Sequence, residues 1–236
     1  PYFYLISYLS SLWSIEMIEY GYHFQAIVGL QSGKPLACEL LLRKDPRTER
    51  STATHSSDFY TENLVTLTNT KIKAIEALSK QHNQWIFLNF TRCEISHLSF
   101  NLCRKRLSKL LPQIQLVIEV TECGGQYNKA IFEKNLLILK KNGFQIAIDN
   151  FGAPNVNIEL LKLLEPDFVK LDISLIRNAT HSEENAIKFY QLVDLIRHRG
   201  HKVVIVGIET KKELLIAQKT RAEFAQGFHY HSPEPV

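Results

Sequence analysis

Side chains whose oxygen atoms could bind a cation recur within or at the end of short apolar runs of this 236-residue chain. Glu39 and Glu119 lie inside such runs, Asn89 and Asp149 end two others, and a fifth run carries Lys170. One such residue alone is most often a polar group satisfied by its neighbours, but several runs with the same pattern favour a shared site. Carboxylate and amide oxygens suit Mg²⁺, Mn²⁺ or Ca²⁺, so the pattern predicts a cation site where the runs end.

These side chains can meet only if the runs are strands of one sheet. Strand-like runs alternate with helical patterns along the chain, which is typical of an α/β protein. The expected strands are residues 24–30, 36–42, 84–90, 115–121, 144–149, 167–172 and 202–207, with a short last one near Phe224. The expected helices include residues 58–81, 129–142 and 182–199. The last two end before Gly143 and Gly200, and Ser182 is a suitable N-cap.

The link between the first two strands, residues 31–34, is too short for a crossover helix. These strands are therefore expected to pair antiparallel as a hairpin, whereas the later strands can be parallel. No linker rich in Pro, Gly or Ser divides the chain, which favours one domain containing an eight-stranded barrel. Functional side chains of such a barrel gather at the C-terminal ends of its strands. A doubly wound open sheet is the alternative.

Composition excludes several classes of protein. Hydrophobic residues make up 45% of the chain and charged residues 22%, so a packed core is expected rather than disorder. The net charge of +4 is mild, and the basic run at residues 104–106 is interpreted as a solvated helix face rather than a nucleic-acid site. The cysteines show no CxxC spacing, which predicts thiols in a reducing compartment and no zinc site. They are Cys38, Cys93, Cys103 and Cys123.

The first 22 residues are rich in aromatic and aliphatic side chains, and the first basic residue of the chain is Lys34. Neither a secretory signal nor a membrane span is expected from such a segment. We expect residues 1–22 to form a helical segment docked on the barrel, with partner binding as the alternative. Residues 23–236 are expected to form the barrel itself, in a cytoplasmic protein.

The strand-end segments resemble the EAL domain, a bacterial family of phosphodiesterases that hydrolyse cyclic di-GMP. Its fold is a modified TIM (β/α)8 barrel with an antiparallel first strand, which the resemblance implies for this α/β chain. The matches cover nearly the whole chain in the family's order. The matching segments, each followed by the family motif that it resembles, are residues 23–25 (YQP), 39–43 (EALLR), 88–91 (VNLS), 118–122 (LEITE), 149–152 (DDFG), 169–172 (IKID), 206–210 (EGVET) and 226–228 (QGY).

The resemblance implies a role for each matching residue. The family's first metal site is matched by Glu39, Asn89, Glu119 and Asp149. The lysine that helps orient the attacking water is matched by Lys170, and the supporting second glutamate of EGVE by Glu209. The family's contacts to its dinucleotide are matched by Gln25, Arg43 and Gln226. The resemblance therefore implies that the open end of the barrel, its nucleotide mouth, binds cyclic di-GMP beside one Mg²⁺, Mn²⁺ or Ca²⁺.

Two departures from the family pattern concern a second metal. The family holds this metal with the second Asp of DDFG and the first Glu of EGVE, where this chain has Asn150 and Val206. Hydrolysis with two metals needs both cations to generate hydroxide and to stabilise the reacting oxygens. We therefore expect no second metal and no useful catalysis. Glu39 and Lys170 are then expected to be remnants of a catalytic site that no longer functions. Pro154 changes the loop after the fifth strand, so dimerisation of the family type is not expected either.

Three functions are compatible with this pattern. The first is an inactive EAL-like regulator that acts by binding another protein. For this function the chain resembles the short, degenerate EAL proteins of enteric bacteria that bind the flagellar master transcription regulator and suppress motility. The second is a cyclic di-GMP receptor without hydrolysis, and the third is a weak phosphodiesterase in which Glu209 replaces a lost ligand. No direct contact with nucleic acid or a membrane is expected.

Overall fold

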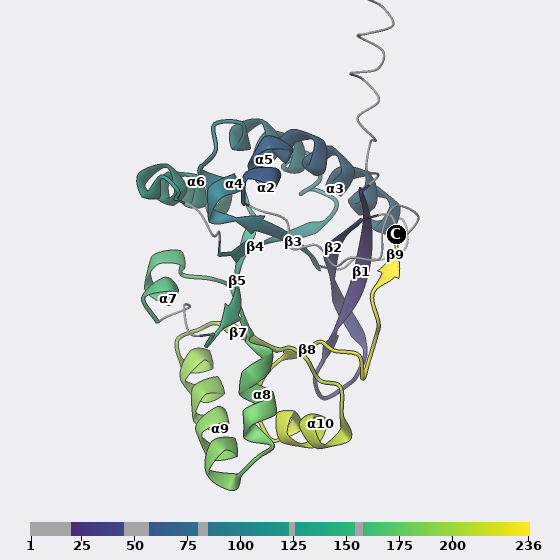
Figure 1. The fold of residues 1–236 in the computed structure, drawn as a ribbon, viewed down its shortest axis with the longest axis vertical. Helices are drawn as coiled ribbons and strands as arrows, with labels where there is room; N and C mark the ends of the chain where they lie inside the picture. Colours follow the sequence, from purple (N-terminus) through teal and green to yellow (C-terminus); the bar gives the residue numbers. More distant parts are fainter. Residues whose placement is uncertain (1–19, 45–56, 80–84, 123–125, 154–157) are drawn as a thin grey trace, which may run out of the picture.

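The computed structural model describes residues 20–44, 57–79, 85–122, 126–153 and 158–236. In this part of the chain eight strands close into a ring, and the helices pack on its outside (Figure 1). The strands of the ring are β1 (Tyr20–Gly29), β2 (Pro35–Lys44), β3 (Trp85–Thr91), β4 (Gln115–Thr121), β5 (Gln145–Phe151), β6 (Phe168–Leu171), β7 (Lys202–Ile205) and β8 (Phe224–Ala225). All the expected strands are confirmed, although β1 begins earlier than residue 24.

The first strand closes the ring and runs against its neighbours. β1 pairs antiparallel with β2, from Tyr20 opposite Lys44 to Val28 opposite Pro35, and antiparallel with β8 through Val28 and Ala225. Strands β2 to β8 are parallel to one another. The expected hairpin and the barrel with an antiparallel first strand are therefore confirmed, and the open sheet is wrong.

A short strand outside the ring brings the end of the chain back to β1. β9 (Glu234–Pro235) pairs antiparallel with β1 at His23 and Phe24. The backbone N–H of Val236 donates to the carbonyl of Tyr22 at 3.0 Å. The last residue therefore lies beside the beginning of β1.

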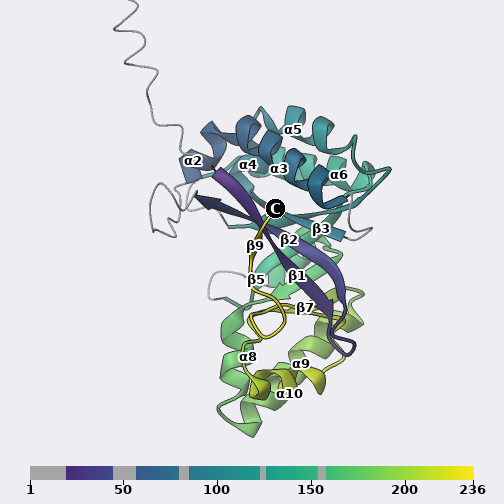
Figure 2. The same cartoon turned by 90° about the vertical axis from the view of Figure 1, so that its right-hand side faces the viewer.

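The helices fall into two groups on opposite sides of the ring (Figures 1 and 2). On one side lie α2 (Ser57–Glu62), α3 (Leu64–Ser79), α4 (Arg92–Ser96), α5 (Phe100–Leu107) and α6 (Lys129–Lys141). On the other lie α8 (Ile173–Ala179), α9 (Glu183–His198) and α10 (Lys211–Gln218), while α7 (Ile158–Leu164) packs near β5. The helix expected at residues 58–81 is two helices, because the chain breaks at Asn63. The helices expected at 129–142 and 182–199 are α6 and α9.

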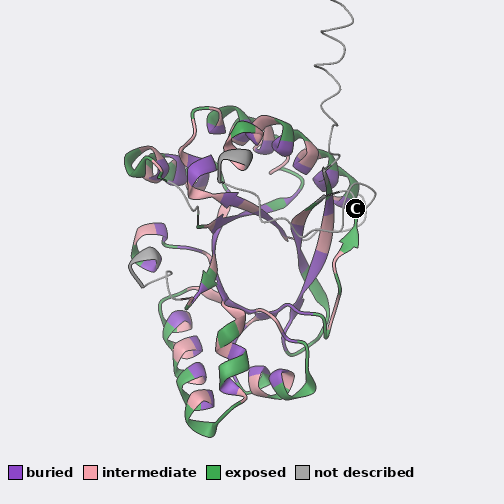
Figure 3. Cartoon of the chain, in the orientation of Figure 1, coloured by how far each residue is buried: buried purple, intermediate pink, exposed green. Residues whose placement is uncertain are grey.

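The core has two layers, one between strands and helices and one inside the ring. Figure 3 shows the ring strands as mostly buried and the outer faces of the helices as exposed. The inner layer is fully apolar and contains the aromatic rings of Phe87, Phe168 and Phe224. Trp85 packs edge-on against Phe168 and Phe224, with ring centroids 5.8 Å apart in both pairs. The ring is thus filled with side chains and is not a pore.

Several expectations outside the fold are resolved or corrected. Cys38 and Cys103 are buried thiols as expected, but Cys93 is disulfide-bonded, so the expectation that all the cysteines are thiols is wrong. The expected N-terminal segment lies mostly in residues 1–19, outside the described part. No helix within the described ranges combines the length and apolar character that a bilayer crossing requires.

Candidate functional site

The candidate site is a layer of side chains inside the ring, next to the inner apolar layer. The apolar layer consists of Ile27, Ala37, Phe87, Val117, Ala147, Phe168, Val204 and Phe224. Side chains two residues apart in a strand point to the same face. Two residues beyond these positions, toward the end of the barrel where the parallel strands finish, come Gln25, Glu39, Asn89, Glu119, Asp149, Lys170, Val206 and Gln226. The alternation of the strands therefore assembles the predicted residues in one layer.

Lys170 is at the centre of this layer. Its Nζ lies 2.8 Å from Glu39 Oε2, 2.6 Å from Glu119 Oε1 and 3.9 Å from Asp149 Oδ1. Lys170 is 3% exposed and Glu119 is fully buried. One ammonium thus faces three carboxylates in a place that water reaches poorly, where an unpaired charge is costly.

Amide side chains complete the contacts of Glu39. Asn89 Nδ2 donates to Glu39 Oε1 at 2.8 Å, and Gln226 Nε2 donates to Glu39 Oε2 at 2.9 Å. Gln226 Nε2 also donates to Gln25 Oε1 at 3.1 Å, and Gln25 Nε2 donates to the carbonyl of His231 at 2.9 Å. Four of the predicted residues are therefore joined in one network that holds Glu39 in place.

The electrostatics of the layer follow from this crowding. Burial opposes the charge of Lys170, but the carboxylates of Glu119, Glu39 and Asp149 raise its pKa. Burial alone would raise the pKa of Glu39, yet Lys170 and the amide donors lower it. Burial and the repulsion of Glu39 raise the pKa of Glu119 well above its usual range. Three acids therefore share the one ammonium of Lys170, which favours the uptake of a proton or of a further cation by this layer.

The chemistry of this layer fits one divalent cation. Glu39, Asn89, Glu119 and Asp149 offer only oxygen ligands of the kind that Mg²⁺, Mn²⁺ and Ca²⁺ prefer. Glu119 Oε2 is buried and has no hydrogen-bond partner, so one ligand atom is available. As the described side chains stand, no three acidic, histidine or cysteine groups among them form a metal-binding cluster. A cation would therefore have to share these acids with Lys170.

The two positions of the family's second metal carry no free anionic group. Asn150 Nδ2 donates to Asp149 Oδ2 at 2.6 Å, and Asn150 has a positive φ of 52°. Val206 is half-buried and packs against the inner apolar layer. Glu209, the proposed replacement ligand of the third hypothesis, is 3.4 Å from Arg177 in an exposed ion pair. Asp149 is thus bound by an amide where a second cation would need an anion.

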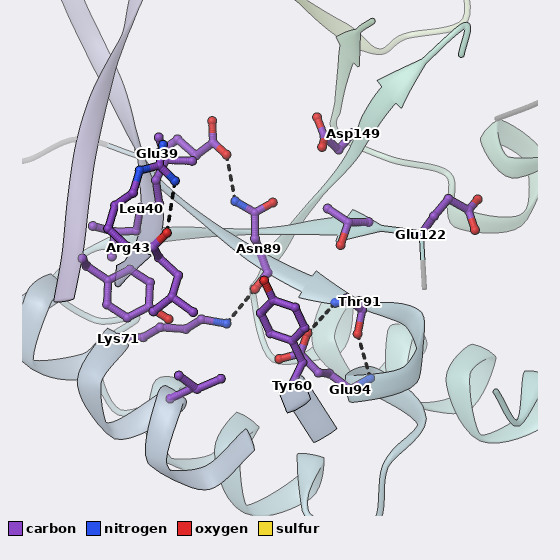
Figure 4. A pocket seen from close by; sticks show the side chains of 15 residues that line it. Glu39, Leu40, Arg43, Tyr60, Lys71, Asn89, Thr91, Glu94, Glu122 and Asp149 are labelled. Carbon is purple, nitrogen blue, oxygen red and sulfur yellow. Dashed lines mark hydrogen bonds between the residues drawn. The ribbon is translucent and has the colours of Figure 1, made fainter. Parts of the chain in front are cut away.

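Two adjoining cavities cover the site and share Glu39 and Asp149 in their walls. The larger, of about 410 Å³, extends past Asn89 and Arg43 (Figure 4). The smaller, of about 270 Å³, is lined among others by Gln25, Lys170, Val206, Glu209 and Gln226. All predicted ligand-binding residues except the fully buried Glu119 therefore line one of the two cavities.

The larger cavity also contains residues that the sequence analysis missed. Tyr22, Tyr60, Lys71 and Glu94 line it together, and Lys71 and Glu94 are 5% and 2% exposed. The signal for Lys71 was available, because it occupies a position of the apolar stripe of α3. Glu94 is the fourth residue of the segment 91–94, whose T-x-x-E pattern is that of a capping box.

Comparison with known proteins points to one family. The sequence profile of the EAL domain matches residues 14–233 of this chain. The probable cyclic di-GMP phosphodiesterase PdeG of Escherichia coli (strain K12) is 31% identical over 120 residues, which are 51% of this chain and 24% of PdeG. The probable cyclic di-GMP phosphodiesterase PdeA of the same strain is 29% identical over 121 residues, 51% of this chain and 17% of PdeA. The chain thus spans less than a quarter of the length of these relatives.

A solved structure gives the same picture for the fold. The calcium and cyclic di-GMP complex of Klebsiella pneumoniae BlrP1 is similar to this chain with a TM-score of 0.75 and 26% sequence identity. The similarity covers 92% of this chain and 56% of the BlrP1 chain. The closed mixed barrel described above is therefore shared with a protein whose complex holds both a divalent cation and the dinucleotide.

Proposed function

Because the chain belongs to the EAL domain family, we propose that it is a regulatory domain that keeps the nucleotide mouth, has lost hydrolysis and acts by binding a partner protein. The observation that carries the loss of hydrolysis is the pair of second-metal positions. The Asn150 amide is bonded to Asp149, and Val206 packs on the apolar layer inside the ring. Neither position offers the negative charge that a second cation requires.

The chemistry of phosphodiester hydrolysis explains why this pair matters. When bound, one divalent cation at Glu39, Asn89, Glu119 and Asp149 would supply a Lewis acid to a phosphate oxygen. Lys170 is held by carboxylates through contacts of 2.6 and 2.8 Å and keeps its proton, so it is a poor base for activating water. This chain lacks two anionic ligands for the second cation, so it also lacks the stabilisation that a pair of cations gives to the attacking and leaving oxygens.

Product analysis with cyclic di-GMP in Mg²⁺ or Mn²⁺ tests the loss of hydrolysis. We expect no turnover by the wild-type protein and measurable turnover by the double variant Asn150→Asp, Val206→Glu, which restores both anions. The single variant Asn150→Asp is the matched control and should stay inactive. Product formed by the wild type at enzyme-like rates, and abolished by Glu39→Ala, would show that the proposal is wrong.

Binding of cyclic di-GMP without hydrolysis is a second candidate function. It is supported by the cavity of about 410 Å³, whose wall combines the oxygen ligands with the exposed guanidinium of Arg43. A guanidinium can bind a phosphate through two parallel hydrogen bonds. Calorimetric titration with cyclic di-GMP should show binding in Ca²⁺ and weaker binding in chelator, because a cation offsets the repulsion between the acids and the phosphates. If cyclic di-GMP produces neither heat of binding nor a shift in Tm in either buffer, a receptor function for cyclic di-GMP is excluded.

The partner of the regulatory function is proposed to be a protein in the cytoplasm. The resemblance to enteric EAL-like regulators supports the flagellar master transcription regulator as that partner, and motility as the process. Gel filtration of the purified domain with the purified regulator tests this assignment. Co-elution in a defined ratio is expected, and separate elution at micromolar concentrations of both proteins would remove the regulator as a partner.

A further inference from the structure

Two buried ionisable side chains, Lys71 and Glu94, lie in the wall of the larger cavity, beyond the residues matched to the family. Figure 4 shows Tyr60, Lys71 and Glu94 on one side of Asn89, with Asp149 on the other. We call the part of the cavity lined by Tyr22, Tyr60, Lys71 and Glu94 the β3 pocket, because it adjoins the end of β3. Lys and Glu are almost never this deeply buried without a specific partner or a role.

Glu94 has a spare acceptor atom in this wall. Its Oε2 accepts from the backbone N–H of Thr91 at 2.7 Å, which completes the capping box of α4. Its Oε1 is buried and has no hydrogen-bond partner. A buried carboxylate oxygen without a donor is unfavourable, so a donor supplied from the cavity would be stabilising.

A second capping box in the same chain shows that the spare atom is not a consequence of the motif. α10 begins with Thr210 and Glu213 in the same arrangement as Thr91 and Glu94. Glu213 Oε2 accepts from the N–H of Glu209 at 2.9 Å, from the N–H of Thr210 at 2.8 Å and from Thr210 Oγ1 at 3.0 Å. Neither oxygen of Glu213 is buried without a partner, and Glu213 lines neither cavity. The unpartnered oxygen is thus specific to the β3 pocket.

Lys71 connects this pocket to the candidate cation site. Its Nζ donates to the carbonyl of Asn89 at 2.6 Å and lies 3.4 Å from the centre of the Phe90 ring. The side chain of Asn89 in turn donates to Glu39. Residue 89 therefore borders both regions, and a ligand whose phosphate lies at Glu39 and Arg43 can extend its base toward Glu94.

We propose that the β3 pocket binds the heterocyclic base of a nucleotide, with Glu94 Oε1 accepting an N–H of that base. The inference rests on the proposed binding of cyclic di-GMP and deepens it, because it assigns the part of the protein that reads the base. The tyrosine rings of Tyr22 and Tyr60 offer aromatic surface for a planar group. Guanine presents two adjacent N–H donors to such an acceptor, at N1 and at its 2-amino group. The 6-amino group of adenine is instead flanked by the ring nitrogens N1 and N7, whose lone pairs a carboxylate repels, so the pocket favours guanine.

Calorimetric titrations in Ca²⁺ test this assignment, with cyclic di-GMP and cyclic di-AMP as the two probes. The wild type should bind cyclic di-GMP at least tenfold more tightly than cyclic di-AMP. Glu94→Gln keeps an oxygen for the cap but offers a weaker, uncharged acceptor, and it should reduce both the affinity for cyclic di-GMP and the preference over cyclic di-AMP about tenfold. Glu213→Gln is the matched control, because it alters an equivalent cap outside the cavity, and it should leave both values unchanged.

The possible outcomes separate this inference from the function on which it rests. If the wild type binds cyclic di-GMP, and Glu94→Gln binds it with the same affinity and the same preference over cyclic di-AMP, the inference alone is overturned. No binding by the wild type would overturn both. If Glu94→Gln does not fold, as judged by thermal unfolding, the wild-type preference decides: a ratio near one between the two probes overturns the base assignment, and a ratio of ten or more supports it.

Discussion

Replacing Lys170 by Met should destabilise the domain strongly, because it leaves a group of buried carboxylates without their counter-charge. Met has nearly the length of the lysine stem and fills the same space, so the change removes the ammonium and little else. In the native protein that ammonium is 2.8 Å from Glu39 and 2.6 Å from Glu119, and Lys170 is 3% exposed. These contacts are buried and short, unlike those of a surface ion pair.

The size of the effect follows from that burial. Removing one partner of a buried ion pair commonly costs about 3–5 kcal/mol, because the other charge remains buried and unpaired. For a domain of this length 1 kcal/mol corresponds to roughly 2–4 °C in Tm. We therefore expect Lys170→Met to lower Tm by roughly 6–20 °C at neutral pH, on the combination of these two ranges.

The deficit should depend on pH in a defined direction. The pKa of Glu39 in the native protein is lowered from its ordinary value of 4.5, so its contribution to stability is present above that value and is lost as the pH falls through the native pKa. In Lys170→Met the carboxylates are unpaired and their pKa values rise. Protonation then relieves the variant as the pH falls, so its deficit should be largest near neutral pH and shrink toward pH 5.

Thermal unfolding from pH 5 to pH 8, with and without Ca²⁺, measures this prediction. Ca²⁺ should restore part of the lost stability of the variant, since a cation can take the place of the ammonium. Lys188→Met is the matched control: its partner Glu184 lies 2.6 Å away, but both side chains are exposed, and such pairs contribute little. A Lys170→Met deficit no larger than that of Lys188→Met, or one independent of pH, would refute the electrostatic account of this layer.

Two substitutions and one labelling experiment test the packing of the barrel further. Gly207 has a φ of 75° and an added Cβ would collide with Ile173, so Gly207→Ala should lower Tm by several degrees, and an unchanged Tm would contradict that contact. Phe168→Ala should cost about 3–5 kcal/mol in denaturant unfolding, because the ring is fully buried inside the barrel; a loss below about 1 kcal/mol would mean that the layer repacks. Burial and the nearby Glu39 raise the pKa of the Cys38 thiol to about 12, so peptide mapping should find residue 38 unlabelled by a disulfide reagent at pH 7 until the protein unfolds, and rapid labelling of the native state would be the contrary result.

The sequence predicts the ring and its polar layer well, because both depend on alternation within strands. Val117 faces the apolar layer and Glu119 the polar one, and the two-residue period places them there whatever the helices do. The same period places Phe168 and Lys170. The antiparallel direction of β1 follows from the short turn at residues 31–34, which leaves no room for a crossover helix between β1 and β2.

What sequence reasoning missed depends on contacts between distant segments. The partners of Lys71 are the carbonyl of Asn89 and the Phe90 ring, which only the packing of α3 on β3 brings near. The disulfide of Cys93 was missed as well, because the cysteines show no regular spacing along the chain. The break between α2 and α3 at Asn63 has no proline or glycine to mark it. Two signs were available in the sequence: the charge of Lys71 within the apolar stripe of α3, and the T-x-x-E pattern that ends at Glu94.

The reversed direction of β1 determines where the chain enters and leaves the domain. In a barrel whose strands are all parallel, the first strand would begin at the end opposite the ligand mouth. Here Tyr20 lies level with Lys44 at the end of β2, and Val236 is bonded to Tyr22 close by. The start of β1 and Val236 therefore both lie at the end of the barrel where the parallel strands finish, which is the end that carries the cavities. A change in the backbone of β1 at this end would consequently be felt both by Tyr22 in the cavity wall and by the pairing with β9.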